Sequence, residues 1–127
     1  MSKIVLDTNV LVSALLTPAG NPAKIYRMFL IGVIPLVLSD GIYAEYRDVL
    51  FRPRLRFPSD AVGTILAAIR QYGETIVPIV SSIEMVDEDD RVFYDTAKTA
   101  GAYLITGNTK HYPREDFILT PSEFLGL

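Results

Sequence analysis

The chain of 127 residues contains no cysteine or tryptophan, and its only histidine is His111. Without a thiol it can form neither a disulfide framework, a cysteine nucleophile nor a Cys-ligated metal centre. A single imidazole also excludes a site built from several histidines. A Ser-His-Asp triad would have to use His111, and no glycine pattern of a nucleophile elbow accompanies it. The reactive groups that remain in quantity are the 15 carboxylates of Asp and Glu.

The chain also lacks a long uninterrupted apolar stretch. The longest one, residues 28–38, contains Gly32 and Pro35 and is shorter than the roughly 18 apolar residues that a membrane span needs. The apolar run that begins at Ile4 is too short for a signal peptide, so we expect a cytoplasmic protein without a membrane partner. The formal net charge of −3 is unlike the basic balance of proteins that coat nucleic acid by bulk charge.

Short apolar runs alternate with helical patterns along the chain, and no linker or repeat divides it. We therefore expect one domain over residues 1–127, of the α/β class, with a parallel sheet covered by helices on both faces. Gly73 suits the C′ position after one helical pattern, and Gly101 ends another. The expected strands are 3–6, 34–38, 75–80, 102–106 and 117–120, and the expected helices are 10–16, 22–31, 40–50, 58–72, 91–100 and 121–125.

Two polar triplets, Asp7-Thr8-Asn9 and Thr106-Gly107-Asn108, directly follow the first and fourth expected strands. Ligands of open parallel sheets bind beyond the carboxyl ends of the strands, so the triplets would meet there if these two strands are neighbours. Thr106 and Asn108 could then orient a water or a ligand. The alternatives are ordinary structural roles, a helix N-cap for Asp7 and turn chemistry around Gly107 for the second triplet.

Four consecutive acids, Asp87 to Asp90, precede the fifth expected helix. Acids in a first helical turn complement the helix dipole and are usually solvated. Four together raise one another's pKa unless a cation neutralises them, so at least one is a credible metal ligand. Asp95 lies about 140° round the helix from Asp90 and is expected to be an outer or surface group.

Glu45 lies beside the apolar face of its helix, where a solvated glutamate is the ordinary expectation. It would join the acids only if that helix leans over the strand ends. Oxygen ligands of this kind suit Mg²⁺ or Mn²⁺. Such an ion can lower the pKa of a bound water and neutralise a phosphodiester, which indicates metal-assisted phosphodiester hydrolysis.

A basic segment interleaves four arginines with two phenylalanines, as Arg47, Phe51, Arg52, Arg54, Arg56 and Phe57. Guanidinium groups pair with phosphate oxygens, and exposed aromatic rings stack on the bases of a single strand. The simpler interpretation is a solvated loop whose two phenylalanines anchor in the core.

Residues 6–15, LDTNVLVSAL, resemble the opening of a PIN domain, and residues 87–111 resemble its second half, with the Thr106-Gly107-Asn108 turn in order. Glu45 in Tyr43-Ala44-Glu45-Tyr46 falls where the family has its middle acid. The resemblance covers nearly the whole chain and is strongest to the subgroup of toxins from toxin–antitoxin pairs.

The resemblance implies a three-layer fold with about five parallel strands in the order 3-2-1-4-5. It also implies Mg²⁺- or Mn²⁺-dependent endonucleolytic cleavage of single-stranded or loop RNA, with an antitoxin and a second copy of the chain as partners. By the resemblance, the catalytic metal ligands are Asp7, Glu45 and Asp90, with Asp89 as the neighbour most easily confused with Asp90. The substrate contacts that we expect from the residues themselves are Thr8, Asn9, Thr106, Arg47, Arg52 and Arg54.

One departure from the family concerns Asn108, which stands where many members carry a fourth acid. An amide can accept from a metal-bound water but adds no charge, so a second ion would bind more weakly. This favours an alternative, a non-catalytic or weakly active module that binds RNA or protein. Another alternative is a phosphoaspartate domain: the haloacid-dehalogenase type would normally have Asp at Asn9, and the receiver type would need Asp near Ser81 or Ser82.

Overall fold

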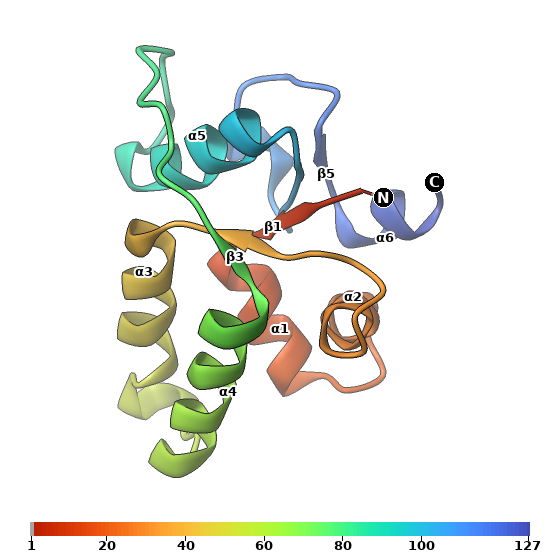
Figure 1. The fold of residues 1–127 in the computed structure, drawn as a ribbon, viewed down its shortest axis with the longest axis vertical. Helices are drawn as coiled ribbons and strands as arrows, with labels where there is room; N and C mark the ends of the chain where they lie inside the picture. Colours follow the sequence, from red (N-terminus) through yellow and green to blue (C-terminus); the bar gives the residue numbers. More distant parts are fainter. Residues whose placement is uncertain (1) are drawn as a thin grey trace.

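A short parallel sheet runs through the middle of the computed structural model, which describes residues 2–127 (Figure 1). In its main ladder, β1 (Ile4–Leu6) pairs with β4 (Tyr103–Ile105), and β4 pairs with β5 (Ile118–Leu119). A second parallel ladder joins β2 (Val37–Leu38) to β3 (Glu74–Thr75). The α/β class and the expected contact between the first and fourth strands are therefore confirmed.

Within residues 2–127, the two ladders are joined by one backbone bridge. Ile4 forms a parallel bridge with Leu36, and its N–H donates to the carbonyl of Pro35 at 3.0 Å. The expected single sheet of five strands is therefore wrong in detail, because the hydrogen bonding forms one ladder of three strands and one of two. Pro35 has no N–H and contributes only its carbonyl to the join.

The third strand is much shorter than the expected 75–80. The N–H of Ile76 makes the last bond to β2, to the carbonyl of Leu38 at 2.8 Å. β2 ends there because Ser39 caps the next helix, where its hydroxyl accepts from the N–H of Ile42 at 3.4 Å. The following residues cross over α5, and the N–H of Ile79 donates to Thr99 Oγ1 at 2.9 Å (Figure 1).

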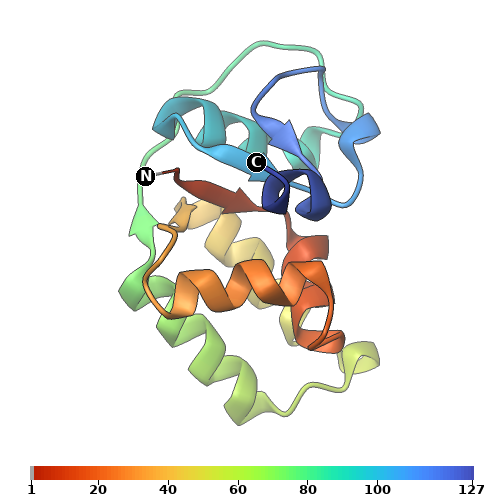
Figure 2. The same cartoon turned by 90° about the vertical axis from the view of Figure 1, so that its right-hand side faces the viewer.

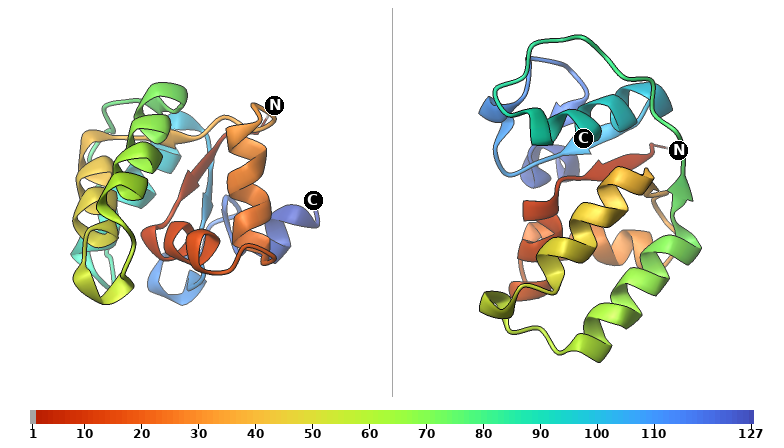
Figure 3. Two further views of the ribbon diagram at one scale, coloured as in Figure 1. Left: turned by 90° about the horizontal axis from the view of Figure 1, so that it is seen from below. Right: turned by 90° about the vertical axis from the view of Figure 1, so that its left-hand side faces the viewer.

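Helices cover the sheet on both faces. α5 (Arg91–Ala100) lies on one face, and α1 (Thr8–Leu16) and α2 (Asn21–Leu30) lie on the other (Figure 2). α3 (Asp40–Leu50) packs beside α4 (Ser59–Tyr72) on the flank (Figure 3), and α6 (Pro121–Leu125) packs on α2. Short 3₁₀ turns occur at η1 (Pro53–Leu55), η2 (Glu88–Asp90) and η3 (Thr109–His111). Within residues 2–127, none of the helices combines the length and the apolar character that crossing a membrane requires.

The two helix-ending glycines have different reasons to be glycine. Gly101 has a φ of +65° and ends α5 in the left-handed conformation, as expected. Gly73 ends α4 as expected, but with a φ of −77° it does so without the left-handed conformation. A Cβ at position 73 would lie 2.5 Å from the carbonyl of Ile69 and 2.6 Å from Leu38 Cδ2. Glycine is needed there because the end of α4 approaches β2 closely.

Candidate active site

Asp7 lies at the carboxyl end of β1 and is only 8% exposed. It occupies the N-cap position of α1, but its side chain makes no capping hydrogen bond. Instead, its Oδ2 accepts from Thr106 Oγ1 at 2.8 Å and from the phenol of Tyr112 at 3.0 Å. The carboxylate is therefore held by the segment that follows β4, and among the described residues no side chain donates to its Oδ1.

Glu45 reaches the same region from α3. The hydroxyl of Thr8 donates a hydrogen bond to Glu45 Oε2. Burial raises the pKa of Glu45, and the charges of Asp7 and Asp89 raise it further, whereas the Thr8 hydrogen bond and Arg52 oppose the shift. The helix therefore leans over the strand ends, which was the condition for Glu45 to join the other acids.

Asp90 stands at the end of η2, where α5 begins. Burial raises its pKa to about 6, with further raising contributions from Asp7, Asp87 and Glu45 and a lowering one from His111. The imidazole Nδ1 of His111 lies 3.9 Å from Asp90 Oδ2. Asp90 thus carries a charge that its surroundings disfavour as long as no cation is near.

Together, Asp7, Glu45 and Asp90 form a carboxylate cluster at the carboxyl ends of β1 and β4. In the described part of the chain none of the three is in an ion pair with lysine or arginine. These hard oxygen donors fit Mg²⁺ or Mn²⁺. In residues 2–127, no group of three or more acidic or histidine side chains is placed so that it could hold a metal ion. That is compatible with Mg²⁺, which usually keeps several waters and binds through one or two carboxylates.

The two polar triplets meet as the strand-end argument predicted. Besides the bond from Thr106 to Asp7, the exposed Asn9 accepts at its Oδ1 from the N–H of Gly107 at 3.4 Å. The N–H of Asn108 donates to Thr106 Oγ1 at 3.1 Å. Asp89 is exposed, and its N–H donates to Asp87 Oδ1 at 3.0 Å, so it lies on the open side of the cluster.

Thr8 and Thr106, expected to contact substrate, are 7% and 0% exposed. Each donates its hydroxyl to a carboxylate of the cluster. They are therefore buried beneath the carboxylates, where Thr8 fixes the position of Glu45 and Thr106 fixes that of Asp7.

The arginine segment lies at the end of α3 and in η1. Arg47, Phe51 and Arg52 line a cavity of about 530 Å³. Phe51 is 45% exposed, whereas Phe57 packs against the core. Arg52 forms an exposed ion pair with Asp48 at 2.9 Å, and Arg54 is exposed. Of the two interpretations of the phenylalanines, core anchoring holds for Phe57 and exposure for Phe51.

Tyr112 is the main residue of the site that the sequence reasoning missed. Its ring is 5% exposed, and burial together with the charge of Asp7 raises its pKa well above the ordinary value. The phenol therefore stays protonated and acts as a donor. The only sequence signal was its place shortly after the Thr106-Gly107-Asn108 turn, and a tyrosine in a loop has no characteristic spacing.

Asp95 is a further correction, since it is 3% exposed rather than a surface group. Its Oδ2 accepts from the N–H of Ser81 at 3.2 Å. It fastens the segment that crosses α5.

Comparison with known proteins identifies relatives of this chain. Residues 3–110 match the sequence profile described as the PIN domain. The chain is also similar to "Uncharacterized protein MJ1680" from Methanocaldococcus jannaschii, with 33% identity over 109 residues. That match covers 84% of this chain and 70% of the archaeal protein.

Proposed function

The chain belongs to the PIN domain family, whose members are typically nucleases, and we propose that it is a divalent-metal-dependent endoribonuclease that cleaves single-stranded or loop RNA. The observation that carries this proposal is the mutual effect of the acids. Burial and the charge of Asp7, with smaller contributions from Asp87 and Glu45, raise the pKa of Asp90. No lysine or arginine of the described residues pairs with Asp7, Glu45 or Asp90. Such a cluster favours the binding of a cation.

Asp7, Glu45 and Asp90 would hold Mg²⁺ or Mn²⁺, with Asp89 as an additional carboxylate and Asn108 as an acceptor for a metal-bound water. The ion would lower the pKa of a coordinated water and neutralise charge on the phosphodiester. Because Asn108 carries no charge, we expect one ion to bind tightly and a second one weakly.

The chain's own contribution is to hold its acids in position before a substrate arrives. Thr106 and Tyr112 both donate to one oxygen of Asp7, and Thr8 donates to Glu45. Hydrogen bonds to metal-ligating side chains fix their orientation, and their loss typically costs about 10- to 100-fold in metal affinity or activity. Thr8, Thr106 and Tyr112 are therefore positioning residues in this proposal.

The RNA strand would be gripped by Arg47, Arg52 and Arg54, with the exposed Phe51 as a stacking platform for an unpaired base. The ion pair of Arg52 with Asp48 is exposed and of small energetic value, so Arg52 can exchange it for a phosphate. Asn9 lies exposed at the strand ends, where it would contact the substrate.

The test is cleavage of single-stranded RNA by the purified protein. We expect cleavage with Mg²⁺ or Mn²⁺, none with EDTA, and a loss of at least about 100-fold in Asp7→Asn. The matched control is Asp60→Asn, which changes an exposed acid of α4 that the proposal does not use. If Asp7→Asn cleaves RNA as fast as the unaltered protein, the site is wrong.

A second candidate function, a non-catalytic module that binds RNA or protein, is favoured by Asn108. Calorimetric titration with Mn²⁺ distinguishes the two functions. The enzyme should bind Mn²⁺ and lose this binding in Asp90→Asn, whereas a non-catalytic module should not bind Mn²⁺ in either form. Membership in the PIN family removes the phosphoaspartate alternative. Action as a cytoplasmic toxin, with an antitoxin and a second copy of the chain as partners, belongs to the proposal. Inspection of the adjacent reading frame for an encoded antitoxin tests the first partner, and the molar mass from light scattering tests whether two copies of the chain associate.

A further inference from the structure

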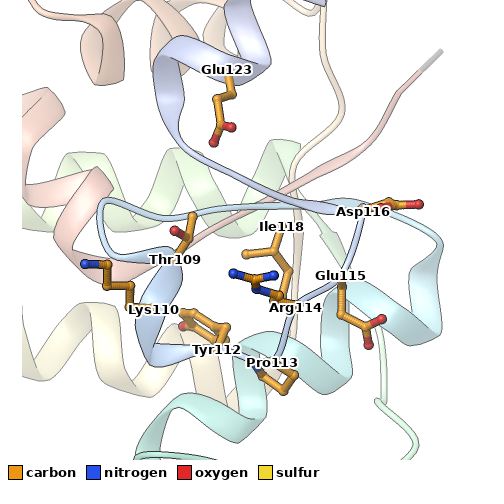
Figure 4. A pocket seen from close by; sticks show the side chains of 9 residues that line it. All are labelled: Thr109, Lys110, Tyr112, Pro113, Arg114, Glu115, Asp116, Ile118 and Glu123. Carbon is orange, nitrogen blue, oxygen red and sulfur yellow. The ribbon is translucent and has the colours of Figure 1, made fainter.

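A cavity of about 630 Å³ lies next to the carboxylate cluster and shares Tyr112 with it (Figure 4). The phenol of Tyr112 donates to Asp7, while the same side chain lines the cavity. The walls come from η3, the loop that follows it, β5 and α6, and the residues that matter here are Thr109, Lys110, Arg114, Glu115 and Glu123.

The 3₁₀ turn η3 connects the two places. Its last residue, His111, lies 3.9 Å from Asp90 of the cluster. Its first two residues, Thr109 and Lys110, line the cavity. A strand that leaves the carboxylate cluster across this turn therefore has only one helical turn to pass before it reaches the cavity.

The cations of the cavity are available for a ligand. Lys110 and Arg114 are exposed, and neither takes part in any ion pair recorded within residues 2–127. Figure 4 shows the guanidinium of Arg114 extending into the middle of the cavity, toward Thr109. This side chain offers a fork of N–H donors that matches the oxygens of a phosphate.

The same lining carries three acids, Glu115, Asp116 and Glu123, which keep their negative charges. Glu115 accepts from the phenol of Tyr94, and Glu123 Oε1 accepts from the N–H of Thr120 at 2.9 Å. The carboxylate of Asp116 points away from the cavity in Figure 4. A phosphate would therefore have to lie beside Arg114, Lys110 and the Thr109 hydroxyl, away from the carboxylates of Glu115 and Glu123, with Pro113 and Ile118 as the apolar wall.

We propose that this cavity binds a phosphate of a nucleotide that flanks the scissile bond of the RNA substrate. The inference rests on the proposed function, because the strand must cross the carboxylate cluster to arrive here. Arg114 and Lys110 bind the phosphate oxygens, and the apolar wall packs against the sugar or base. Cleavage should then depend on RNA length, since a dinucleotide that spans only the scissile bond cannot reach both places.

The test compares Arg114→Gln and Lys110→Gln with Lys3→Gln, which removes a cation at the opposite end of β1. A fluorescein-labelled single-stranded hexanucleotide RNA is titrated in EDTA and followed by fluorescence polarization, so that binding is measured without cleavage. We expect each cavity variant to weaken binding by at least fivefold. Each should also lower the slope of log Kd against log salt by about 0.7, the value for one phosphate contact on a single strand. Lys3→Gln should leave both quantities unchanged.

The second measurement is cleavage with Mg²⁺. KM for the hexanucleotide should rise in Arg114→Gln, while kcat/KM for the dinucleotide should stay the same. If Arg114→Gln and Lys110→Gln bind the hexanucleotide as tightly as Lys3→Gln, the proposal is overturned even if RNA is cleaved. If the cavity variants weaken binding as expected but the unaltered protein cleaves no RNA, only the nuclease function is overturned. Competition with inorganic phosphate distinguishes a site for a phosphate of the RNA strand from a site for the free phosphate ion. Displacement of the RNA at micromolar phosphate would show a site for the free anion and overturn the assignment to the strand.

Discussion

The phenol of Tyr112 donates a hydrogen bond to Oδ2 of Asp7 at 3.0 Å, across 105 residues of sequence. This contact ties the loop after β4 to the acid after β1. The same carboxylate oxygen also accepts from Thr106. An oxygen with two fixed donors keeps its orientation when the other oxygen of the carboxylate binds a ligand.

Removal of this donor should weaken the site. We expect Tyr112→Phe to lower Mn²⁺ affinity and RNA cleavage by about 10-fold or more, and the free energy of unfolding by about 1 kcal/mol. Calorimetry and urea titration measure the two effects. Tyr72→Phe is the control, because Tyr72 is 67% exposed. Equal behaviour of the two variants would contradict the positioning role.

Thr8→Val should act on Glu45. The hydroxyl of Thr8 lowers the pKa of Glu45 against the raising effects of burial and neighbouring charge, so its loss should raise that pKa further. We expect the acidic limb of the pH–rate profile to move to higher pH. Thr8→Ser keeps the hydroxyl and should restore the original profile. A shift that is the same in both variants would contradict the role of the Thr8 hydrogen bond, since Thr8→Ser keeps the hydroxyl.

The stability of the metal-free protein should depend on Asp90. Its folded-state pKa, about 6, lies above the ordinary 3.8, so ionisation of this group costs the native state stability. That cost is absent below about pH 4 and fully present above about pH 7. In EDTA at pH 7.5, Asp90→Asn should therefore raise Tm by a few degrees, for a gain on the order of 1–2 kcal/mol after solvent screening.

Thermal melts from pH 4 to pH 8 test this sign. The advantage of Asp90→Asn should shrink as pH falls, and Mg²⁺ should stabilise the unaltered protein more than the variant. An advantage that is constant over this range would show that the charge of Asp90 is not its cause.

Two glycines of the same region should respond oppositely to alanine. Gly73→Ala would place a Cβ 2.5 Å from the carbonyl of Ile69, and we expect a loss of about 1–3 kcal/mol. Gly63 lies within α4 with nothing near its added Cβ, so Gly63→Ala should gain up to about 1 kcal/mol. Urea titrations give both values. Equal stabilities of the two variants would contradict the close approach at Gly73.

The strand-end argument predicted the centre of the site because it depends only on local patterns. Asp7 and Thr106 each follow a buried apolar run directly, and two parallel neighbours bring such residues together. The place of Glu45 in the site depends on the orientation of α3 over the strand ends, which no local sequence pattern predicts. Its assignment came from the resemblance to the family. Tyr112 and the true length of β3 depend on which segments pack against each other, so sequence periodicity could not reveal them.

Asp95 and Gly73 show the same limit. The helical position of Asp95 was predicted correctly, but the segment that covers it lies 14 residues away in sequence, at Ser81. Gly73 was predicted as a helix end, which it is, yet its reason is a contact with β2. In both cases the local structure was predictable and the neighbour was not.

Within the described residues, the two ladders are joined by one backbone bridge, between Ile4 of β1 and Leu36, which directly precedes β2. On one side lie β2, β3, α3 and α4, with Glu45; on the other lie the main ladder and α5, with Asp7 and Asp90. Side-chain bonds supplement that bridge, from Tyr46 to the carbonyl of Leu6, from Thr8 to Glu45 and from Thr96 to Ser39. Because Glu45 lies on one side of this join and Asp7 and Asp90 lie on the other, we expect their like charges to weaken it. Neutralisation of Asp7, Glu45 and Asp90 should therefore strengthen the contact between the two ladders. Amide hydrogen exchange in β2 should then become slower.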